Sequence, residues 1–161
     1  ERIDVRRVIE NAVTLTRSQW RYAAEVVTDY GPLPDAILCS QGECTQLVVN
    51  LIVNAAQALA GQRREGKGVI TVRARAADGW CVVEVADDGP GIPARIQGRV
   101  FDPFFTTKPI GQGTGQGLTL ARAIAQRHGG TIALESNPEQ GTTVTVRLPL
   151  HGAMPGVSSA A

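Results

Sequence analysis

An apolar segment with a single polar stripe constrains this chain more than any other feature of its sequence. The segment runs from Ser40 to Gly61, and apolar residues cover most of the helix that it predicts. The polar side chains follow one another at spacings of three, four, four and three residues, which places them on one helical face. They are Glu43, Gln46, Asn50, Asn54 and Gln57. Because a buried amide without a partner costs about 1–3 kcal/mol, something polar must lie against this stripe.

The two asparagines of the stripe have two interpretations. An asparagine in a core helix ordinarily hydrogen-bonds to neighbouring backbone groups. Two amides one helical turn apart also suit a hard cation that keeps most of its water. Mg²⁺, held by a few protein oxygens and by substrate phosphates, is such a cation. The stripe alone leaves both interpretations open.

A glycine-rich turn follows a predicted strand in the middle of the chain. The strand Val82–Ala86 leads directly into residues 87–92, where two glycines and a proline force a tight turn. Such a turn brings bare backbone close to a ligand. The carboxylate of Asp87 can accept a hydrogen bond from an exocyclic amine, which favours adenine over guanine. By itself, the pattern is equally typical of an ordinary Asp-Gly turn.

A second glycine-rich segment lies further along the chain. Residues 111–117 contain four glycines, and a helical pattern begins at Leu118. A glycine-rich loop before a helix presents unpaired N–H groups and the positive end of the helix dipole, which suits phosphates. A dinucleotide-binding turn needs a strand directly before it, and a P-loop needs a Gly-Lys-Ser/Thr ending; neither is present. We therefore interpret this segment as a flexible lid.

In this order, the segments resemble the ATP-binding catalytic domain of sensor histidine kinases, in the superfamily that includes DNA gyrase, Hsp90 and MutL. The resemblance covers residues 1–150 and leaves 151–161 as a flexible tail. The motifs that carry it are an N box at Gln46–Ala58, glycine boxes at Asp87–Gly91 and Gly113–Leu118, an F box at Val100–Lys108 and a glycine-threonine box at Gly141–Val144. The lid sequence is similar to those of nitrogen-regulation and oxygen-sensing kinases.

The resemblance implies ATP and Mg²⁺ as cofactors and assigns roles to individual residues. Asn54 resembles the Mg²⁺ ligand, whereas Asn50 and Lys108 resemble the catalytic residues beside the phosphates. Asp87 resembles the carboxylate that binds the adenine amine, with support from the Thr142 hydroxyl. The other implied nucleotide contacts are Lys108 again and Gly89, Gly91, Ile92, Phe104, Thr107, Gly113, Thr114, Gly115, Gly117 and Leu118.

Asn50 also discriminates within the superfamily. The ATPase branches carry a Glu general base at this position, and an amide cannot accept a proton from water. We therefore expect ATP binding without rapid hydrolysis and transfer of the γ-phosphate to a nucleophile on a partner. In histidine kinases this nucleophile is a His on a separate dimerisation domain, and the phosphoryl group then passes to an Asp on a response regulator receiver domain.

The two histidines of the chain, His128 and His151, lack the His-Glu-x-x-Asn-Pro context of the family's phosphoacceptor. The chain is therefore expected to be a fragment that does not autophosphorylate alone. Three alternatives stay open: an ATPase or chaperone-type module of the same superfamily, a protein-serine kinase, and a degenerate nucleotide-binding regulatory module.

Composition bears on the remaining classes of protein. The 161 residues fit one domain, and a net charge of +1 gives no general attraction to nucleic acid or to a membrane surface. We expect no nucleic-acid or membrane contact by this domain, which leaves open a membrane anchor elsewhere in the parent protein. The cysteines Cys39, Cys44 and Cys81 are odd in number and lack Cys-x-x-Cys spacing. They predict neither a disulfide framework nor a zinc site, and they indicate a reduced, cytoplasmic compartment.

The periodicities predict an α/β two-layer sandwich of the Bergerat ATP-binding type, with a mixed sheet of about five strands and three helices on one face. Helices are expected near Val5–Trp20, over 40–61 with Ser40 and Glu43 as a capping box, and from Leu118 to His128, followed by a left-handed glycine. Strands are expected near Ala24–Asp29, Ala36–Cys39, Val69–Ala76, Trp80–Ala86, Thr131–Ser136 and Thr142–Leu148, with a hairpin turn at Asp78-Gly79.

Overall fold

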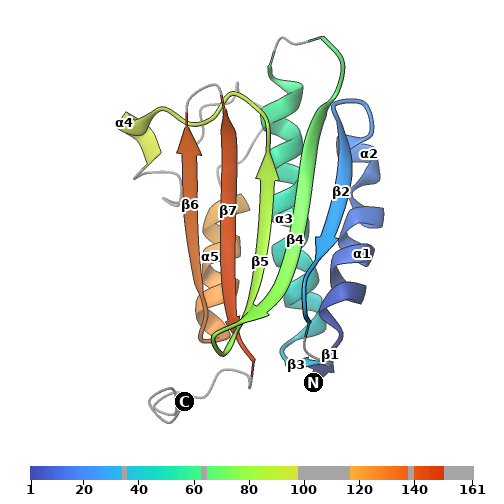
Figure 1. Ribbon diagram of the computed structural model, residues 1–161, viewed down its shortest axis with the longest axis vertical. Coiled ribbons are helices and arrows are strands. Elements are labelled where there is room, and N and C mark those ends of the chain that lie inside the picture. Colours follow the sequence, from blue (N-terminus) through green and yellow to red (C-terminus); the bar gives the residue numbers. More distant parts are fainter. Residues whose placement is uncertain (34–35, 63–64, 98–116, 138–139, 151–161) are drawn as a thin grey trace.

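A mixed five-stranded sheet forms one layer of the molecule (Figure 1). The computed structural model describes residues 1–33, 36–62, 65–97, 117–137 and 140–150. Across the sheet the strands lie in the order β2 (Ala24–Tyr30), β4 (Gly68–Ala77), β5 (Trp80–Asp87), β7 (Gly141–Pro149) and β6 (Thr131–Asn137). β2 pairs with β4 in parallel, and the other neighbours are antiparallel.

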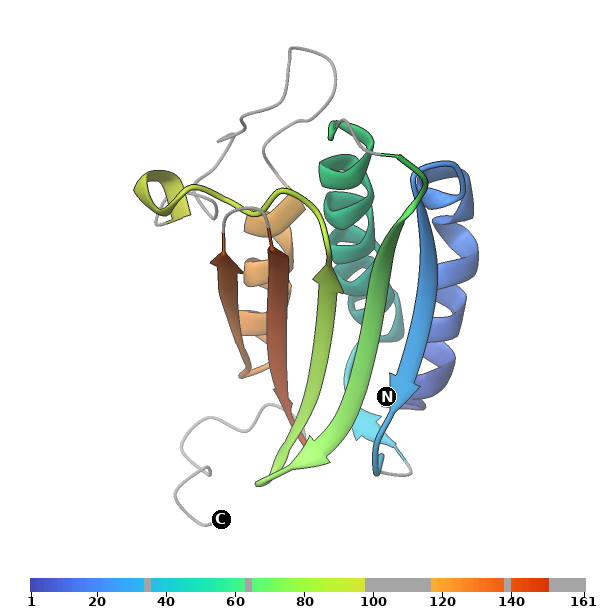
Figure 2. The same ribbon diagram turned by 45° about the horizontal axis from the view of Figure 1, so that its top comes forward.

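The three longer helices lie together on one face of this sheet, as Figure 2 shows. They are α1 (Val5–Leu15), α3 (Gln41–Ala60) and α5 (Gly117–Arg127); α2 (Arg17–Trp20) and α4 (Ala94–Gln97) are single turns. α3 packs against both α1 and α5. The predicted two-layer α/β sandwich is confirmed, with three long helices on one face. Among the described helices, including the long α3, none combines the length and apolarity needed to cross a bilayer.

Two elements differ from the prediction. The first helix is interrupted at Thr16, whose buried hydroxyl donates to the carbonyl of Ala12 at 2.7 Å. α1 ends just before this residue and α2 begins just after it, which fits the tendency of threonine hydroxyls to compete for helical carbonyls. The short strand near residue 37, β3 (Ile37–Leu38), pairs with β1 (Arg2–Ile3) and not with the main sheet.

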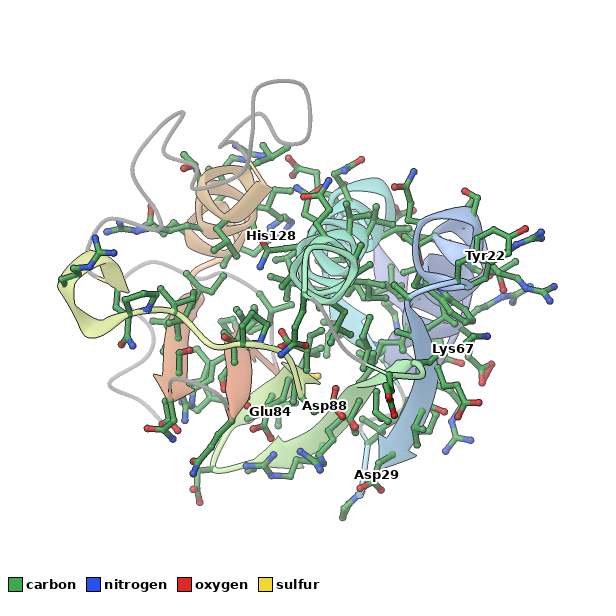
Figure 3. All side chains as sticks on the ribbon, turned by 90° about the horizontal axis from the view of Figure 1, so that it is seen from above. Tyr22, Asp29, Lys67, Glu84, Asp88 and His128 are labelled. Carbon is green, nitrogen blue, oxygen red and sulfur yellow. A yellow bond between two sulfur atoms is a disulfide. The ribbon has the colours of Figure 1, made fainter. Side chains whose placement is uncertain are left out.

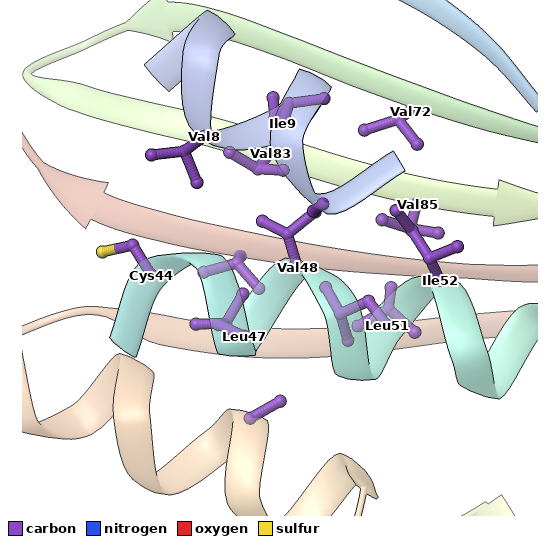
Figure 4. Close-up of a cluster of buried hydrophobic side chains, with 14 of the residues drawn as sticks. Val8, Ile9, Cys44, Leu47, Val48, Leu51, Ile52, Val72, Val83 and Val85 are labelled. Carbon is purple, nitrogen blue, oxygen red and sulfur yellow. The ribbon is translucent and has the colours of Figure 1, made fainter. Parts of the chain in front are cut away.

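The apolar side of α3 supplies much of the core (Figure 4). Leu51 and Ile52 are 1% and 0% exposed, and they belong to one buried cluster with Val72 of β4, Val85 of β5 and Ile9 of α1. Complete burial of one such side chain stabilises the fold by about 1.5–3 kcal/mol. The rotation of α3 about its axis is therefore set by its apolar residues, and its polar stripe faces away from the sheet core.

The hairpin turn between β4 and β5 sets the register that positions the end of β5. Asp78 and Gly79 have φ values of 53° and 84°, as a tight hairpin of this kind requires, and the predicted turn is confirmed. The resulting register places Asp87 opposite Ile70 on one side and Thr142 on the other.

The start of α3 departs from the prediction in two ways. Ser40 Oγ accepts from the N–H of Glu43 at 3.3 Å, as in a capping box, but the N–H of Ser40 donates to Nε2 of His128 at 3.2 Å. The prediction of no disulfide is wrong, because Cys39 and Cys44 are bonded to each other, with 6.9 Å between their Cα atoms. Cys39 precedes the helix and Cys44 lies in its first turn, so the helical turn brings them together without Cys-x-x-Cys spacing.

We predict a large difference between two leucine substitutions. Leu51→Ala removes a side chain that is 1% exposed, so we expect it to lower the free energy of unfolding by about 2–5 kcal/mol. Leu15→Ala is the matched control at a position that is 68% exposed, with an expected loss within about 0.5 kcal/mol. Urea unfolding followed by circular dichroism measures both. Equal losses would contradict the assignment of the α3 core face.

Candidate nucleotide-binding site

The polar stripe of α3 faces α5, which supplies partners at both of its ends. Asn50 Nδ2 donates to the carbonyl of Gly117, the first residue of α5, at 3.5 Å, and Asn50 Oδ1 accepts from Gln46 Nε2 at 2.7 Å. Near the start of α3, the carboxylate of Glu43 pairs with the guanidinium of Arg127, the last residue of α5. The expectation that polar groups lie against the stripe is confirmed.

Asn54 lies one helical turn beyond Asn50 on the same face of α3. It is half-buried, and its side chain makes no hydrogen bond to another residue within the described part of the chain. The amide oxygen of Asn54 therefore keeps its lone pairs available. An uncharged hard oxygen in this state is a suitable ligand for Mg²⁺.

Asp87, the last residue of the central strand β5, carries a half-buried carboxylate. Its Oδ1 accepts from the N–H of Gly89 at 2.9 Å. Burial raises the pKa of Asp87 above its ordinary value of 3.8; hydrogen bonds from the backbone of Gly89 and Thr142 oppose this rise, and the charge of Asp88 adds to it. A further donor to this carboxylate, such as an exocyclic amine, would stabilise its charged form.

Two glycines keep the space beside Asp87 free of side chains. A Cβ atom at Gly141 would lie 2.0 Å from the carbonyl oxygen of Asp87, and φ at Gly141 is +110°, which L side chains rarely adopt. A Cβ atom at Gly89 would lie 2.8 Å from Asp87 Oδ1. Gly141 therefore requires the absence of a side chain, and a side chain at Gly89 would displace the Asp87 carboxylate.

A hydroxyl network fixes the turn after Asp87 to the β6–β7 hairpin. Ser136 Oγ accepts from the N–H of Ile92 at 2.7 Å and lies 2.9 Å from Thr142 Oγ1. Gln97 Nε2 donates to the carbonyls of Ile92 and Ser136 at 2.8 and 3.1 Å. Sequence reasoning missed Ser136 and Gln97. Ser136 flanks the predicted hairpin opposite Thr142, which is a signal that could have found it; no sequence signal pointed to Gln97.

The predicted site residues that the structure describes form two groups. Asp87, Gly89, Gly91, Ile92 and Thr142 lie where β5 and β7 meet, and Asn50, Asn54, Gly117 and Leu118 lie where α3 meets α5. The side chain of Leu118 is buried in the core, so its backbone alone is available to a ligand. Phe104, Thr107, Lys108, Gly113, Thr114 and Gly115 lie outside the described residues.

Leu59, in the last turn of α3, joins the two groups of site residues. Its side chain lies beside Gly89, where an added Cβ atom would be 3.3 Å from Leu59 Cδ2. The end of the asparagine-bearing helix is therefore packed directly against the turn that follows Asp87. This places amide oxygens, a half-buried carboxylate and bare glycine backbone at one end of the sandwich.

The chain is similar to known proteins over most of its length. Residues 40–152 match the family described as "Histidine kinase-, DNA gyrase B-, and HSP90-like ATPase". The chain is 39% identical over 140 residues to the sensor kinase CckA of Brucella abortus, covering 78% of this chain and 14% of that protein. It is 38% identical over 133 residues to the sensory histidine kinase/phosphatase NtrB of Rhodobacter capsulatus, covering 78% of this chain and 37% of that protein.

A solved structure with the same fold is that of full-length ShkA in complex with AMPPNP. It superposes with a TM-score of 0.80 at 25% sequence identity, and the match covers 95% of this chain and 31% of ShkA. The chain therefore spans well under half the length of each of these relatives.

We predict that Asp87→Asn stabilises the ligand-free fold at neutral pH. The folded-state pKa of Asp87 is raised above 3.8, so its contribution to stability is full below about pH 3.8 and is lost as the pH rises through the raised value. The Asn side chain stays uncharged at every pH. The difference in free energy of unfolding between the variant and the parent should therefore grow over that pH range and vanish in acid.

Urea unfolding at a series of pH values measures this difference, with Asp78→Asn in the exposed hairpin turn as the control. An Asp87→Asn variant that is no more stable than the parent at neutral pH would contradict the burial argument.

Proposed function

We propose how the residues of this chain act from the family to which it belongs, the histidine kinase-, DNA gyrase B- and HSP90-like ATPases. Within that family it is a catalytic ATP-binding domain of the sensor histidine kinase type. It binds ATP with Mg²⁺ and presents the γ-phosphate to a histidine on a dimerisation domain of the same protein. The phosphoryl group then passes to an aspartate on a response regulator receiver domain.

The half-buried carboxylate of Asp87 is the observation that carries the proposal. Its raised pKa reflects a charge held in a poorly solvated place, and the N6 amine of adenine is a donor that would compensate for the lost water. Thr142 at the start of β7 lies opposite Asp87 in the strand register, and its hydroxyl pairs with that of Ser136 in β6. This arrangement favours adenine, because guanine presents a carbonyl where adenine presents its amine.

The triphosphate lies toward the junction of α3 and α5 in this proposal. The amide oxygen of Asn54 is free among the described residues and would hold Mg²⁺, which would neutralise part of the phosphate charge. The N–H groups that begin α5 at Gly117 and Leu118 suit the phosphates. Lys108, Phe104, Thr107, Gly113, Thr114 and Gly115 are proposed to complete this side of the site.

Asn50 is proposed as a catalytic residue that positions the start of α5 beside the phosphates and does not act as a base. Its two amide atoms are engaged with Gln46 and with the carbonyl of Gly117, so it links α3 to the start of α5. An amide at this position cannot take a proton from water, which favours transfer to a partner histidine over hydrolysis. We propose a cytoplasmic location for the domain, where ATP and response regulators occur.

We predict that Asn54→Ala selectively removes the Mg²⁺-dependent part of ATP affinity. Loss of one ligand to a charged group corresponds to about 1.5–3 kcal/mol, or about 10- to 100-fold in affinity. Isothermal titration calorimetry of ATP with and without Mg²⁺ measures this, and Asn11→Ala on the exposed face of α1 is the matched control. An unchanged Mg²⁺ requirement in Asn54→Ala would remove this residue from the site.

We also predict that phosphorylation requires a second domain. The chain alone, incubated with γ-labelled ATP and Mg²⁺, should acquire no stable label and should release phosphate slowly. Addition of the separately purified dimerisation domain should produce acid-labile, alkali-stable label on that domain. Steady phosphate release without the partner would favour an ATPase, and binding without transfer would favour a regulatory nucleotide-binding module.

A further inference from the structure

Three side chains that bind soft metal ions lie together at the start of α3, the opposite end of this helix from Asn54. They are Cys39, Cys44 and His128, and their potential ligand atoms all lie within 4.8 Å of one another. Cys39 and Cys44 are each 5% exposed, and the structure joins their sulfur atoms in a disulfide. Figure 3 shows His128 between α5 and α3, where the two helices meet. The predicted nucleotide contacts include none of these three residues.

The imidazole of His128 is held in the tautomer that suits a metal ligand. Its Nδ1 lies 2.8 Å from the carbonyl oxygen of Ile124, and its Nε2 lies 3.2 Å from the N–H of Ser40. Because a backbone N–H can only donate, Nε2 is the acceptor and Nδ1 carries the proton. Metal-binding histidines commonly show this pattern, in which one nitrogen donates to a carbonyl and the other offers its lone pair.

The carboxylate of Glu43 lies beside this cluster of three side chains. Its Oε1 lies 3.8 Å from Nε2 of His128, and its other oxygen pairs with Arg127. The side chain of Glu43 is 39% exposed and that of His128 is 14% exposed, so the cluster can be reached from solvent on this side.

We propose that reduced Cys39 and Cys44, together with Nε2 of His128, bind a thiophilic divalent cation of the Zn²⁺ class, with the carboxylate of Glu43 as the fourth ligand. Two thiolates, one imidazole and one carboxylate form a ligand set that zinc accepts in tetrahedral geometry. The disulfide is the state that cannot bind, because the metal ligand is a thiolate and neither sulfur of an S–S bond is one.

The two states interconvert by a balanced exchange. A thiol reductant, two R–SH, transfers two electrons to the Cys39–Cys44 bond and leaves as R–S–S–R, while each cysteine sulfur gains a proton. Binding of M²⁺ then releases the two thiol protons, and His128 contributes the lone pair of its Nε2. The N–H of Ser40 exchanges its His128 acceptor for an oxygen of Glu43, in the capping-box arrangement that its sequence position allows.

The test uses the whole chain, reduced with a phosphine and kept free of oxygen, and Co²⁺ as the spectroscopic probe. We expect one Co²⁺ per chain, with sulfur-to-cobalt charge-transfer absorption and the visible bands of a tetrahedral site, both abolished by addition of Zn²⁺. The oxidised chain should show neither. Because metal binding buries both thiolates, Zn²⁺ should also slow alkylation of Cys39 and Cys44 as followed by mass spectrometry.

The matched variants are Cys39→Ala, Cys44→Ala and Cys81→Ala. Loss of a direct ligand should weaken Co²⁺ binding by more than the roughly 10- to 100-fold that loss of a second-shell partner causes. Cys81 is the control, since burial in β5 raises the pKa of its thiol to about 11 and it lies outside the cluster. Its variant should bind Co²⁺ as the parent does.

Several results would overturn the proposal. One is the absence of a charge-transfer band in the reduced parent chain with free thiols at 39 and 44. Another is a band that persists in Cys39→Ala or Cys44→Ala. A third is a loss of Co²⁺ affinity in Cys81→Ala equal to that in the other two variants. ATP affinity serves as a check that the variants fold. Cys44 and Asn54 are ten residues apart on α3, about 15 Å at 1.5 Å per residue, so the cysteine variants should bind ATP like the parent.

Discussion

The packing of α3 between the sheet and α5 is the interaction on which the rest of the structure depends. Its apolar face buries Leu51 and Ile52 against the sheet, and this burial fixes how the helix is rotated. The polar stripe then has to face α5, where Asn50 reaches the Gly117 carbonyl and Glu43 reaches Arg127. A helix that belonged only to a core would not need these polar residues.

The two ends of α3 carry different chemistry as a result. At its far end, Leu59 packs beside Gly89, and the turn after Asp87 is held by hydrogen bonds to Ser136. At its near end, Cys39, Cys44 and His128 meet beside the N-cap. The core between the two ends holds these two sets of residues at a fixed separation.

Features that depend on local spacing were predictable from the sequence. The stripe of α3, the strand that ends at Asp87 and the Asp78-Gly79 turn are set by residues close together in the chain, and the structure has all of them. The lid residues, including Lys108, lie outside the described part of the chain, and their roles stay predictions.

Features that depend on distant residues were not predictable in the same way. Ser40 and His128 are 88 residues apart, so the sequence could not show that the N–H of Ser40 donates to the imidazole of His128. The Cys39–Cys44 pair was missed because the spacing rule for cysteines takes no account of a helix that begins between them. Gln97 was missed because it reaches Ser136 across 39 residues and shows no motif of its own.

The burial of Asp87 gives the site its electrostatic character. A carboxylate whose pKa is raised by burial is stabilised by a ligand that donates to it, so nucleotide binding and deprotonation of Asp87 favour each other. The glycines at 89 and 141 are the structural condition for this, because a side chain at 89 would meet the Asp87 carboxylate and one at 141 would meet the backbone of Asp87.

Nuclear magnetic resonance of the ¹⁵N-labelled chain during titration with ATP and Mg²⁺ tests the central claim most directly. The account predicts that the side-chain amide signals of Asn50 and Asn54 and the backbone signals of Gly89 and Gly141 move together with one dissociation constant, while the side-chain amide of Asn11 stays in place. Saturable binding of ATP that leaves the Asn54 and Gly89 signals unmoved would contradict it.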